Sequence, residues 1–277
     1  MIAAARPVST AHPAPRTGRG YLSYTQVTTF QRCPLKWHFE YIAQRPHERV
    51  GAALAFGSAI HTAIELHFRA LLAGCTAPSG EELLCGYDQA WQADAALPVR
   101  YGKGESARSL RATASRVLAA FAGSPHALPG GEILGVEEEL RRPVLPGLPD
   151  LLARLDLIMR TDSALVIRDF KTARSRWTEA NVTEAAPQLL LYGELARPLA
   201  EECGDLSVRL EFVVLTKTRS PGIAVHPVEL DPHQLGRIQR IMIQVWQAMQ
   251  TGHVYPNPSA MNCATCPFQQ ACRAWRG

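Results

Sequence analysis

The first half of the chain shows the hydrophobic spacing of helices. Apolar residues recur at every third or fourth position in four segments, at residues 25–42, 55–73, 81–95 and 107–122. Ser23 is placed to cap the first helix, and Pro34 predicts a break directly after Cys33. A stretch rich in proline and glycine around residues 124–131 ends this helical section.

From residue 131 the pattern changes to that of strands. Short apolar runs at 132–141, 151–160 and 164–170 are separated by Pro, Gly, Asp and Ser. The remaining elements that we predict are a helix at 184–199, strands at 208–216 and 223–229, and a helix at 231–250. This order predicts an α/β fold with a mixed central sheet flanked by helices.

The segments group into a leader and one domain. Residues 1–20 are rich in Ala, Pro, Arg and Gly without periodicity, so we predict a disordered leader. Residues 21–277 are predicted to form a single domain. This domain includes a helical insertion at about 74–130 and a C-terminal segment at about 255–277.

Composition and charge exclude a membrane protein. The chain has 277 residues, of which 47% are hydrophobic, so it can bury a full core. Its longest apolar stretches are far shorter than the roughly 20 residues of a spanning helix. Residues 1–20 lack the apolar region of a signal peptide, and we expect a cytoplasmic location. A net charge of +4 permits a nucleic-acid partner without indicating one.

Four of the seven cysteines are spaced like ligands of a metal cluster. Cys33 lies near the N-terminus, while Cys263, Cys266 and Cys272 form a C-x2-C-x5-C run at the other end. Four thiolates are the number that a 4Fe–4S cluster needs, and such a cluster would join the two ends of the chain. Zinc is an alternative, although structural zinc sites usually have two close pairs of ligands. Disulfides are a further alternative that would require an exported protein.

Two acidic residues and a lysine lie on adjacent predicted strands. Asp156 interrupts an apolar strand, where a carboxylate is costly to bury unless it is paired or binds a cation. Asp169 and Lys171 are two residues apart, so they project to the same face of the next strand. Such groups can hold a divalent cation and act on a phosphodiester. The alternative is a partly buried salt bridge between aspartate and lysine.

Two further pairs of polar residues share helical faces. His61 and Glu65 are four residues apart, as are Gln188 and Tyr192. Taken singly, His61 is compatible with a core histidine, and Glu65 with a surface ion pair to Arg69. The other pair is compatible with an ordinary polar helix surface.

Together these motifs resemble the RecB-type exonuclease family of the P-D-(D/E)-x-K nuclease superfamily, over roughly residues 21–272. That family's pattern runs G-x3-H-x3-E, an apolar G-x-x-D, D-x-K-T and Q-x3-Y. The matching residues, in the same order, are Gly57, His61 and Glu65, then Asp156, then Asp169, Lys171 and Thr172, then Gln188 and Tyr192. Ala153 and Ala173 replace glycines that are common in the family, which affects close backbone packing but removes no ligand.

The resemblance implies a role for each of these residues. The iron–sulfur branch of the family, which includes AddB-type and CRISPR-associated adaptation nucleases, has the same distribution of cysteines. By analogy, Mg²⁺ or Mn²⁺ is held by His61, Asp156, Asp169 and the backbone carbonyl of Phe170. Lys171 is then the catalytic lysine, Gln188 and Tyr192 act at the active site or on DNA, and Glu65 supports the ligands.

The resemblance also implies a restriction-endonuclease-like α/β fold. We therefore expect a metal-dependent DNA exonuclease that acts on single-stranded ends in repair, recombination or a related pathway. The alternative is a catalytically idle iron–sulfur subunit that binds DNA within a nuclease–helicase complex. A redox protein would leave the D-x-K motif unexplained. The sequence contains no P-loop motif, so unwinding would come from a partner helicase.

Overall fold

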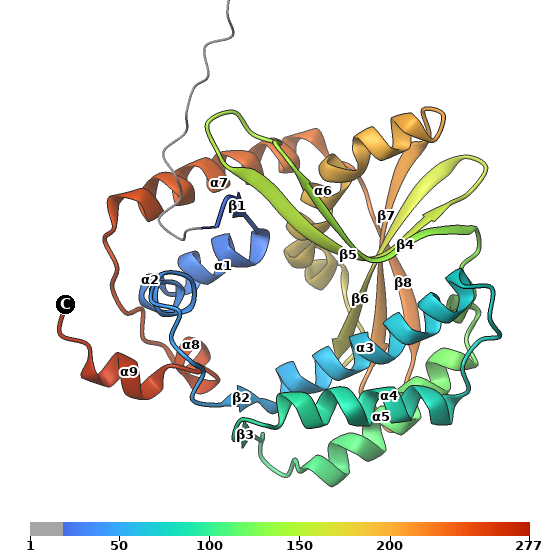
Figure 1. The fold of residues 1–277 in the computed structure, drawn as a ribbon, viewed down its shortest axis with the longest axis horizontal. Coiled ribbons are helices and arrows are strands. Elements are labelled where there is room, and N and C mark those ends of the chain that lie inside the picture. Colours follow the sequence, from blue (N-terminus) through green and yellow to red (C-terminus); the bar gives the residue numbers. More distant parts are fainter. Residues whose placement is uncertain (1–18) are drawn as a thin grey trace, which may run out of the picture.

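A six-stranded sheet lies at the centre of the molecule (Figure 1). The structure is a computed structural model that describes residues 19–277, so the predicted leader lies outside the described residues except for its last two. The strands of this sheet are β1 (Tyr21–Leu22), β4 (Glu132–Arg142), β5 (Asp150–Arg160), β6 (Ala164–Ala173), β7 (Ser207–Thr216) and β8 (Ile223–Val228).

The sheet is mixed, as predicted. Its order is β1-β5-β6-β7-β8, and β4 also pairs with β5. The strands β6 and β7 are parallel, whereas β4–β5, β5–β6 and β7–β8 are antiparallel. A parallel pair needs a long crossover, which here is the helix α6 (Glu179–Glu202). The strand β6 is longer than predicted and extends to Ala173, so it includes Lys171.

Helices cover both faces of the sheet and form a core on each. Because neighbouring strand residues face opposite sides, Val166 and Phe170 pack in one core and Leu165 and Ile167 in the other. The first core lies under α3 (Ala52–Leu72), α4 (Gly80–Asp94) and α5 (Ala107–Ala122). The second lies under α1 (Tyr24–Arg32), α6 and α7 (Pro232–Thr251). These helices confirm the predicted segments.

The predicted break in the first helix is present at Cys33. Ser23 caps α1 by accepting a hydrogen bond from the Gln26 amide at 3.2 Å. Cys33 has an extended backbone, with φ −162° and ψ 102°, and separates α1 from α2 (Pro34–Trp37). A short π-helix, His38–Ile42, continues from α2.

The C-terminal segment lies against this N-terminal region (Figure 1). It contains α8 (Ala260–Ala264) and α9 (Gln269–Ala274). Phe268 is buried with Leu35 and Phe39 in a small core of its own. Short elements that the sequence did not predict are β2 (Val50–Gly51), β3 (Val99–Arg100), the 3₁₀ turn Pro125–Ala127, β1, α8 and α9.

The helices and the domain grouping bear on how the chain is organised. Within residues 19–277, no helix combines the length and the apolar character that crossing a membrane requires. The grouping of these residues into one domain with a helical insertion stays a prediction.

Candidate active site

The strands β5 and β6 separate at the point where the two predicted carboxylates lie. Their last matched pair is Leu157 with Arg168. Asp156 and Asp169 follow, but β5 no longer pairs with β6 there. Instead, the Asp156 carboxylate accepts a hydrogen bond from the Phe170 amide at 2.7 Å. We call the point where β5 and β6 separate the fork. Both carboxylates line one cavity there, and the Phe170 amide, which has no backbone partner on β5, keeps a hydrogen bond through Asp156.

Asp169 and Lys171 project to the same side of β6, as alternation predicts. The Lys171 Nζ lies 2.6 Å from Asp169 Oδ2, and Asp169 is only 3% exposed. The side chain of Phe170 points the other way and packs in the core against Phe68 and Phe121. The salt bridge that we considered as an alternative is thus present, but it lies in a cavity that holds further polar groups.

Lys171 is held from a second direction by α6. Its Nζ donates a hydrogen bond to Gln188 Oε1 at 3.2 Å, and Gln188 Nε2 donates to the Tyr192 hydroxyl at 2.6 Å. Burial raises the pKa of Tyr192, so its hydroxyl stays protonated at neutral pH. Gln188 therefore positions the lysine between α6 and Asp169.

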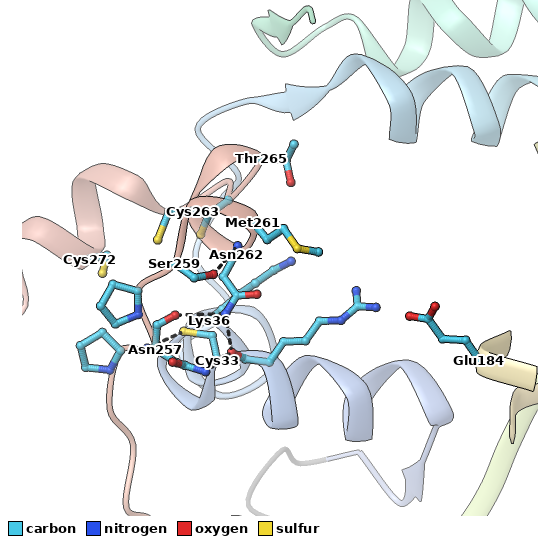
Figure 2. Close-up of a pocket in the computed structure, with 14 residues that line it drawn as sticks. Cys33, Lys36, Glu184, Asn257, Ser259, Met261, Asn262, Cys263, Thr265 and Cys272 are labelled. Atoms are coloured by element: carbon cyan, nitrogen blue, oxygen red, sulfur yellow. Dashed lines mark hydrogen bonds between the residues drawn. The ribbon is translucent and has the colours of Figure 1, made fainter. Parts of the chain in front are cut away.

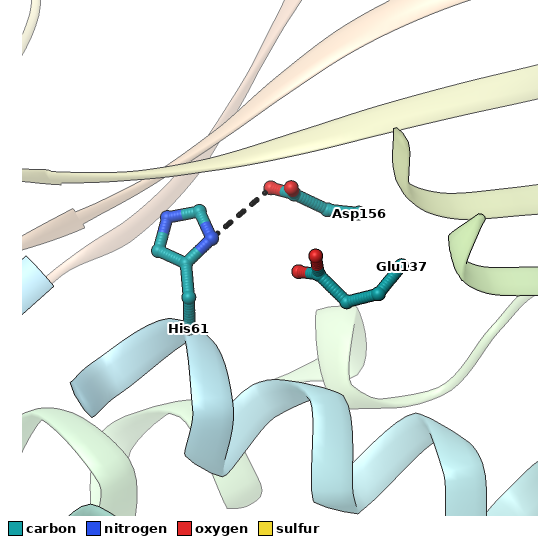
Figure 3. A group of neighbouring side chains, drawn as sticks. All are labelled: His61, Glu137 and Asp156. Atoms are coloured by element: carbon teal, nitrogen blue, oxygen red, sulfur yellow. Dashed lines mark ion pairs between the residues drawn. The ribbon is translucent and has the colours of Figure 1, made fainter. Parts of the chain in front are cut away.

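His61 reaches the same carboxylates from α3. Its Nδ1 lies 3.4 Å from Asp156 Oδ2 (Figure 3). Burial opposes protonation of this imidazole, but the hydrogen bond and charge of Asp156, together with Asp169, outweigh burial and raise the pKa of His61. The neighbouring carboxylates thus favour a positive charge at this position.

Glu137 is a member of the site that the sequence reasoning missed. It lies on β4 across from Asp156. Glu137, Asp156 and His61 each offer one ligand atom, and these three atoms lie within 4.8 Å of one another (Figure 3). Its φ of +52° is a left-handed conformation, which costs a non-glycine residue about 1–2 kcal/mol. Such local strain is often found at functional sites, where it directs a side chain.

Two carboxylates of the site are costly to keep charged without a bound cation. Burial, followed by the charges of Asp156 and Glu65, raises the pKa of Glu137 to about 7. Burial also raises the pKa of Asp169, although Lys171 opposes this effect. A divalent cation would relieve the repulsion between these carboxylates. Within residues 19–277, His61, Glu137 and Asp156 are the one group whose spacing suits a single metal ion.

The raised pKa of Glu137 predicts how stability depends on pH in the metal-free protein. Between the pKa of an unfolded glutamate, about 4.3, and about 7, the folded state binds more protons than the unfolded state. Stability should therefore fall as pH rises through this window, by on the order of 2–3 kcal/mol from this one group. Thermal melting of wild type and Glu137→Gln without divalent metal, at about pH 5 and about pH 8, measures the effect.

The variant should melt only slightly higher than wild type at the lower pH, where Glu137 is neutral in the folded state, and clearly higher at the upper pH, where Glu137 is charged. Addition of Mg²⁺ at the upper pH should raise the melting temperature of wild type more than that of the variant. Parallel pH profiles for the two proteins would contradict a raised pKa at this position.

One cavity of about 370 Å³ collects the predicted site residues. Phe170 is the exception, because its side chain is in the core and only its backbone is near Asp156. Glu65 lines the cavity and also accepts a hydrogen bond from Arg69 at 2.7 Å, as its alternative interpretation predicted. The lining residues are Ser58, His61, Thr62, Glu65, Glu137, Arg154, Asp156, Asp169, Lys171, Gln188 and Tyr192.

A second cavity, of about 510 Å³, collects the four cysteines that the sequence singles out (Figure 2). Cys33, Cys263, Cys266 and Cys272 all line it, although their thiols are not close enough to surround a single metal ion. Burial raises the pKa of the Cys266 and Cys272 thiols. The remaining three cysteines lie outside this cavity.

Direct contacts hold the cysteine-bearing segments together. The Asn257 amide donates to Cys33 Sγ at 3.5 Å, and the side-chain amides of Asn257 and Asn262 each donate to the Arg32 carbonyl at 3.0 Å. The Glu48 carboxylate accepts hydrogen bonds from two backbone amides at the start of α9, each at 3.0 Å. The protein itself therefore brings the two ends together.

Comparisons with known proteins agree with this fold. The family model described as "PD-(D/E)XK nuclease superfamily" matches residues 21–273. The crystal structure of a "Putative exonuclease" from Eubacterium rectale is similar, with a TM-score of 0.57 and 14% identity over 99% of this chain and 95% of that chain. The structure of SSO0001 aligns over 91% of this chain and 96% of its own at 13% identity, but its TM-score is only 0.35. No curated protein matches significantly. Because the family match covers nearly all of the described residues, the chain belongs to the PD-(D/E)XK nuclease superfamily.

Proposed function

We propose that this protein is a Mg²⁺- or Mn²⁺-dependent DNA exonuclease of the RecB-type family, and that it belongs to the iron–sulfur branch. The observation that carries the proposal is the convergence of His61, Asp156, Asp169 and Lys171 in one cavity. These residues come from α3, β5 and β6, so their meeting depends on the tertiary fold. Oxygen and imidazole ligands beside a lysine suit metal-assisted phosphodiester hydrolysis.

The metal-binding part of the site would be built from four side chains. Asp156 is central, because it contacts His61 and faces Glu137. Asp169 adds a nearly fully buried carboxylate, and the carbonyl of Phe170 is a further ligand by family analogy. A bound divalent ion would neutralise phosphate charge and acidify a water molecule. Glu65 lines the cavity next to these groups and would support them.

Lys171 is assigned the catalytic role that does not involve metal binding. Its ammonium group faces the cavity and is fixed by Asp169 and Gln188, so it can contact the attacking water or the phosphate oxygens. Tyr192 completes this arrangement through Gln188. A positioned ammonium stabilises charge as it develops in the transition state.

We further propose that the enzyme digests single-stranded DNA from its ends. The name of the E. rectale protein, "Putative exonuclease", agrees with the part of this proposal that concerns DNA ends. The test compares linear and covalently closed circular single strands of the same sequence, with Mg²⁺ or Mn²⁺. The linear strand should be degraded and the circle should persist, and a blunt duplex should be digested more slowly. Cleavage of the circle at the same rate would overturn the assignment as an exonuclease. A partner helicase would supply single strands from duplex DNA.

The cysteine cavity fits an iron–sulfur cluster better than it fits a single ion. All four cysteines line one cavity. Their thiols, all in the described part of the chain, are nevertheless too far apart to bind one metal ion together. A four-iron cluster spreads its ligands farther apart and accepts N–H···S hydrogen bonds, such as the one from Asn257 to Cys33. We therefore propose a 4Fe–4S cluster that joins the N- and C-terminal segments, with a structural role.

The cluster proposal predicts that Cys33→Ser loses iron and stability together. Protein purified anaerobically should contain about four irons per chain, and the variant should lose most of them. Closing so long a loop restricts the unfolded chain by on the order of 5 kcal/mol if a cluster acts as a cross-link, so the variant should melt at a clearly lower temperature. Iron analysis and thermal melting measure both effects.

Cys75→Ser is the matched control, because Cys75 is exposed and lies outside the cysteine cavity. This variant should retain the iron content and melting temperature of wild type. Stoichiometric zinc in a colourless, stable wild-type protein would refute the cluster.

A further inference from the structure

Three cavities share lining residues, and the middle one lies between α1 and α6. The catalytic cavity adjoins a second cavity of about 370 Å³, and Gln188 lines both. This middle cavity adjoins the cysteine cavity, and Arg32 and Glu184 line both. Figure 2 shows Glu184 on α6, facing the cysteine-bearing segments. A groove thus leads from the catalytic residues to the cysteines, and we call it the α1–α6 groove.

The middle of the α1–α6 groove has the chemistry of a nucleotide site. Tyr24 and Trp177 supply aromatic side chains, and Arg32 supplies an exposed cation. Trp177 is held in place by an edge contact with Phe212, with the ring centroids 5.2 Å apart. Fixed aromatic rings that stack on bases, combined with cations that contact phosphates, are typical of single-strand binding sites.

The middle cavity lies next to the catalytic residues, where a neighbouring nucleotide of the substrate would be expected. Gln188 contacts Lys171 on one side and lines the middle cavity on the other. A strand whose scissile phosphate lies at Lys171 would therefore place a neighbouring nucleotide in the middle cavity. Bases can stack on Trp177 only when they are unstacked from a duplex, because neighbouring base pairs cover their faces there. Glu184 disfavours phosphate at its own position but can accept hydrogen bonds from base amino groups.

We propose that single-stranded DNA occupies the α1–α6 groove, with bases stacked on Trp177 and Tyr24 and a phosphate bound by Arg32. This inference rests on the proposed nuclease function and adds the path of the strand. The cysteine-bearing segment positions Arg32, because Asn257 and Asn262 hold its backbone carbonyl and Cys33 follows it directly. Loss of that segment's structure should therefore weaken DNA binding as well as stability.

The test separates the groove from the catalytic site. We would measure binding of a labelled single-stranded oligonucleotide of about 15 nucleotides, in Ca²⁺, to wild type, Arg32→Ala and Trp177→Ala. Each variant should bind about tenfold more weakly, on the scale of one stacked base or one strong phosphate contact. Hydrolysis of bis(p-nitrophenyl) phosphate, which needs only the catalytic cavity, should change little. Arg108→Ala is the charge-matched control, because Arg108 is exposed on α5 and lines none of the three cavities.

Two outcomes would contradict the proposal that DNA occupies the α1–α6 groove. One is an affinity within about twofold of wild type in both variants. The other is a photocrosslinking map, made with wild-type protein and a DNA oligonucleotide that carries 5-iodo-2′-deoxyuridine, in which the crosslinks avoid Trp177 and Tyr24. The crosslinking map decides the matter even if a variant misfolds. Failure of wild type to hydrolyse both single-stranded DNA and bis(p-nitrophenyl) phosphate would count against the proposed function. The binding and crosslinking data would still test whether DNA occupies the groove.

Discussion

Asp169→Asn is expected to lower the rate of DNA cleavage by about three orders of magnitude or more, because loss of a ligand charge removes several kcal/mol of stabilisation. The carboxylate is nearly fully buried and anchors Lys171 at 2.6 Å, so its loss affects both the metal and the lysine. Single-turnover cleavage in Mg²⁺ and calorimetric titration of Mn²⁺ measure the two effects.

The fold of this variant should remain intact. Since burial raises the pKa of Asp169, a neutral side chain removes an unfavourable charge, and the metal-free variant should melt at or above the wild-type temperature. Asp162→Asn is the matched control, because Asp162 is exposed in the turn between β5 and β6. Turnover of Asp169→Asn at the wild-type rate would show that the site is elsewhere.

Lys171→Ala should lower turnover by roughly two orders of magnitude or more while changing DNA affinity by less than about twofold. The reason is that, in the proposed mechanism, the ammonium acts mainly on charge that develops in the transition state. Gln188→Ala removes one of the contacts that fix this lysine but leaves its charge in place, so its turnover should fall less. Cleavage under single-turnover conditions and binding in Ca²⁺ separate the two quantities.

Lys103→Ala provides a control for the loss of one positive charge, because Lys103 is exposed and lines neither the catalytic cavity nor the groove. Equal losses of binding and cleavage in Lys171→Ala would make the lysine a phosphate anchor. That result would favour the alternative of an idle iron–sulfur subunit that binds DNA.

Features set by local periodicity could be predicted from the sequence. The helix α5 has the predicted bounds of 107–122, because it buries one apolar face at helical spacing. The strands β7 and β8 lie within two residues of their predicted bounds, and β7 ends in a continuous buried run. The meeting of His61 with Asp156 could be predicted only from the order of motifs that resembles a known family. Spacing alone does not show that α3 crosses the fork between β5 and β6.

Features that depend on distant pairing could not be predicted. Glu137 joins the site because its backbone is left-handed and because β4 places it across from Asp156, and neither is visible in the local sequence. Three consecutive glutamates in a predicted strand were the available signal, since they break the alternation of apolar and polar residues. The strand β1 has two residues and exists only through its parallel pairing with β5.

The most direct test of the central claim is cleavage of end-labelled, linear single-stranded DNA by the wild-type protein purified anaerobically. With Mg²⁺ or Mn²⁺ at the proposed catalytic site, the strand should be shortened progressively from an end, and removal of the divalent ion should stop the reaction. Ca²⁺ should support binding with little cleavage. A protein that binds this DNA yet leaves it intact with either Mg²⁺ or Mn²⁺ would contradict the account.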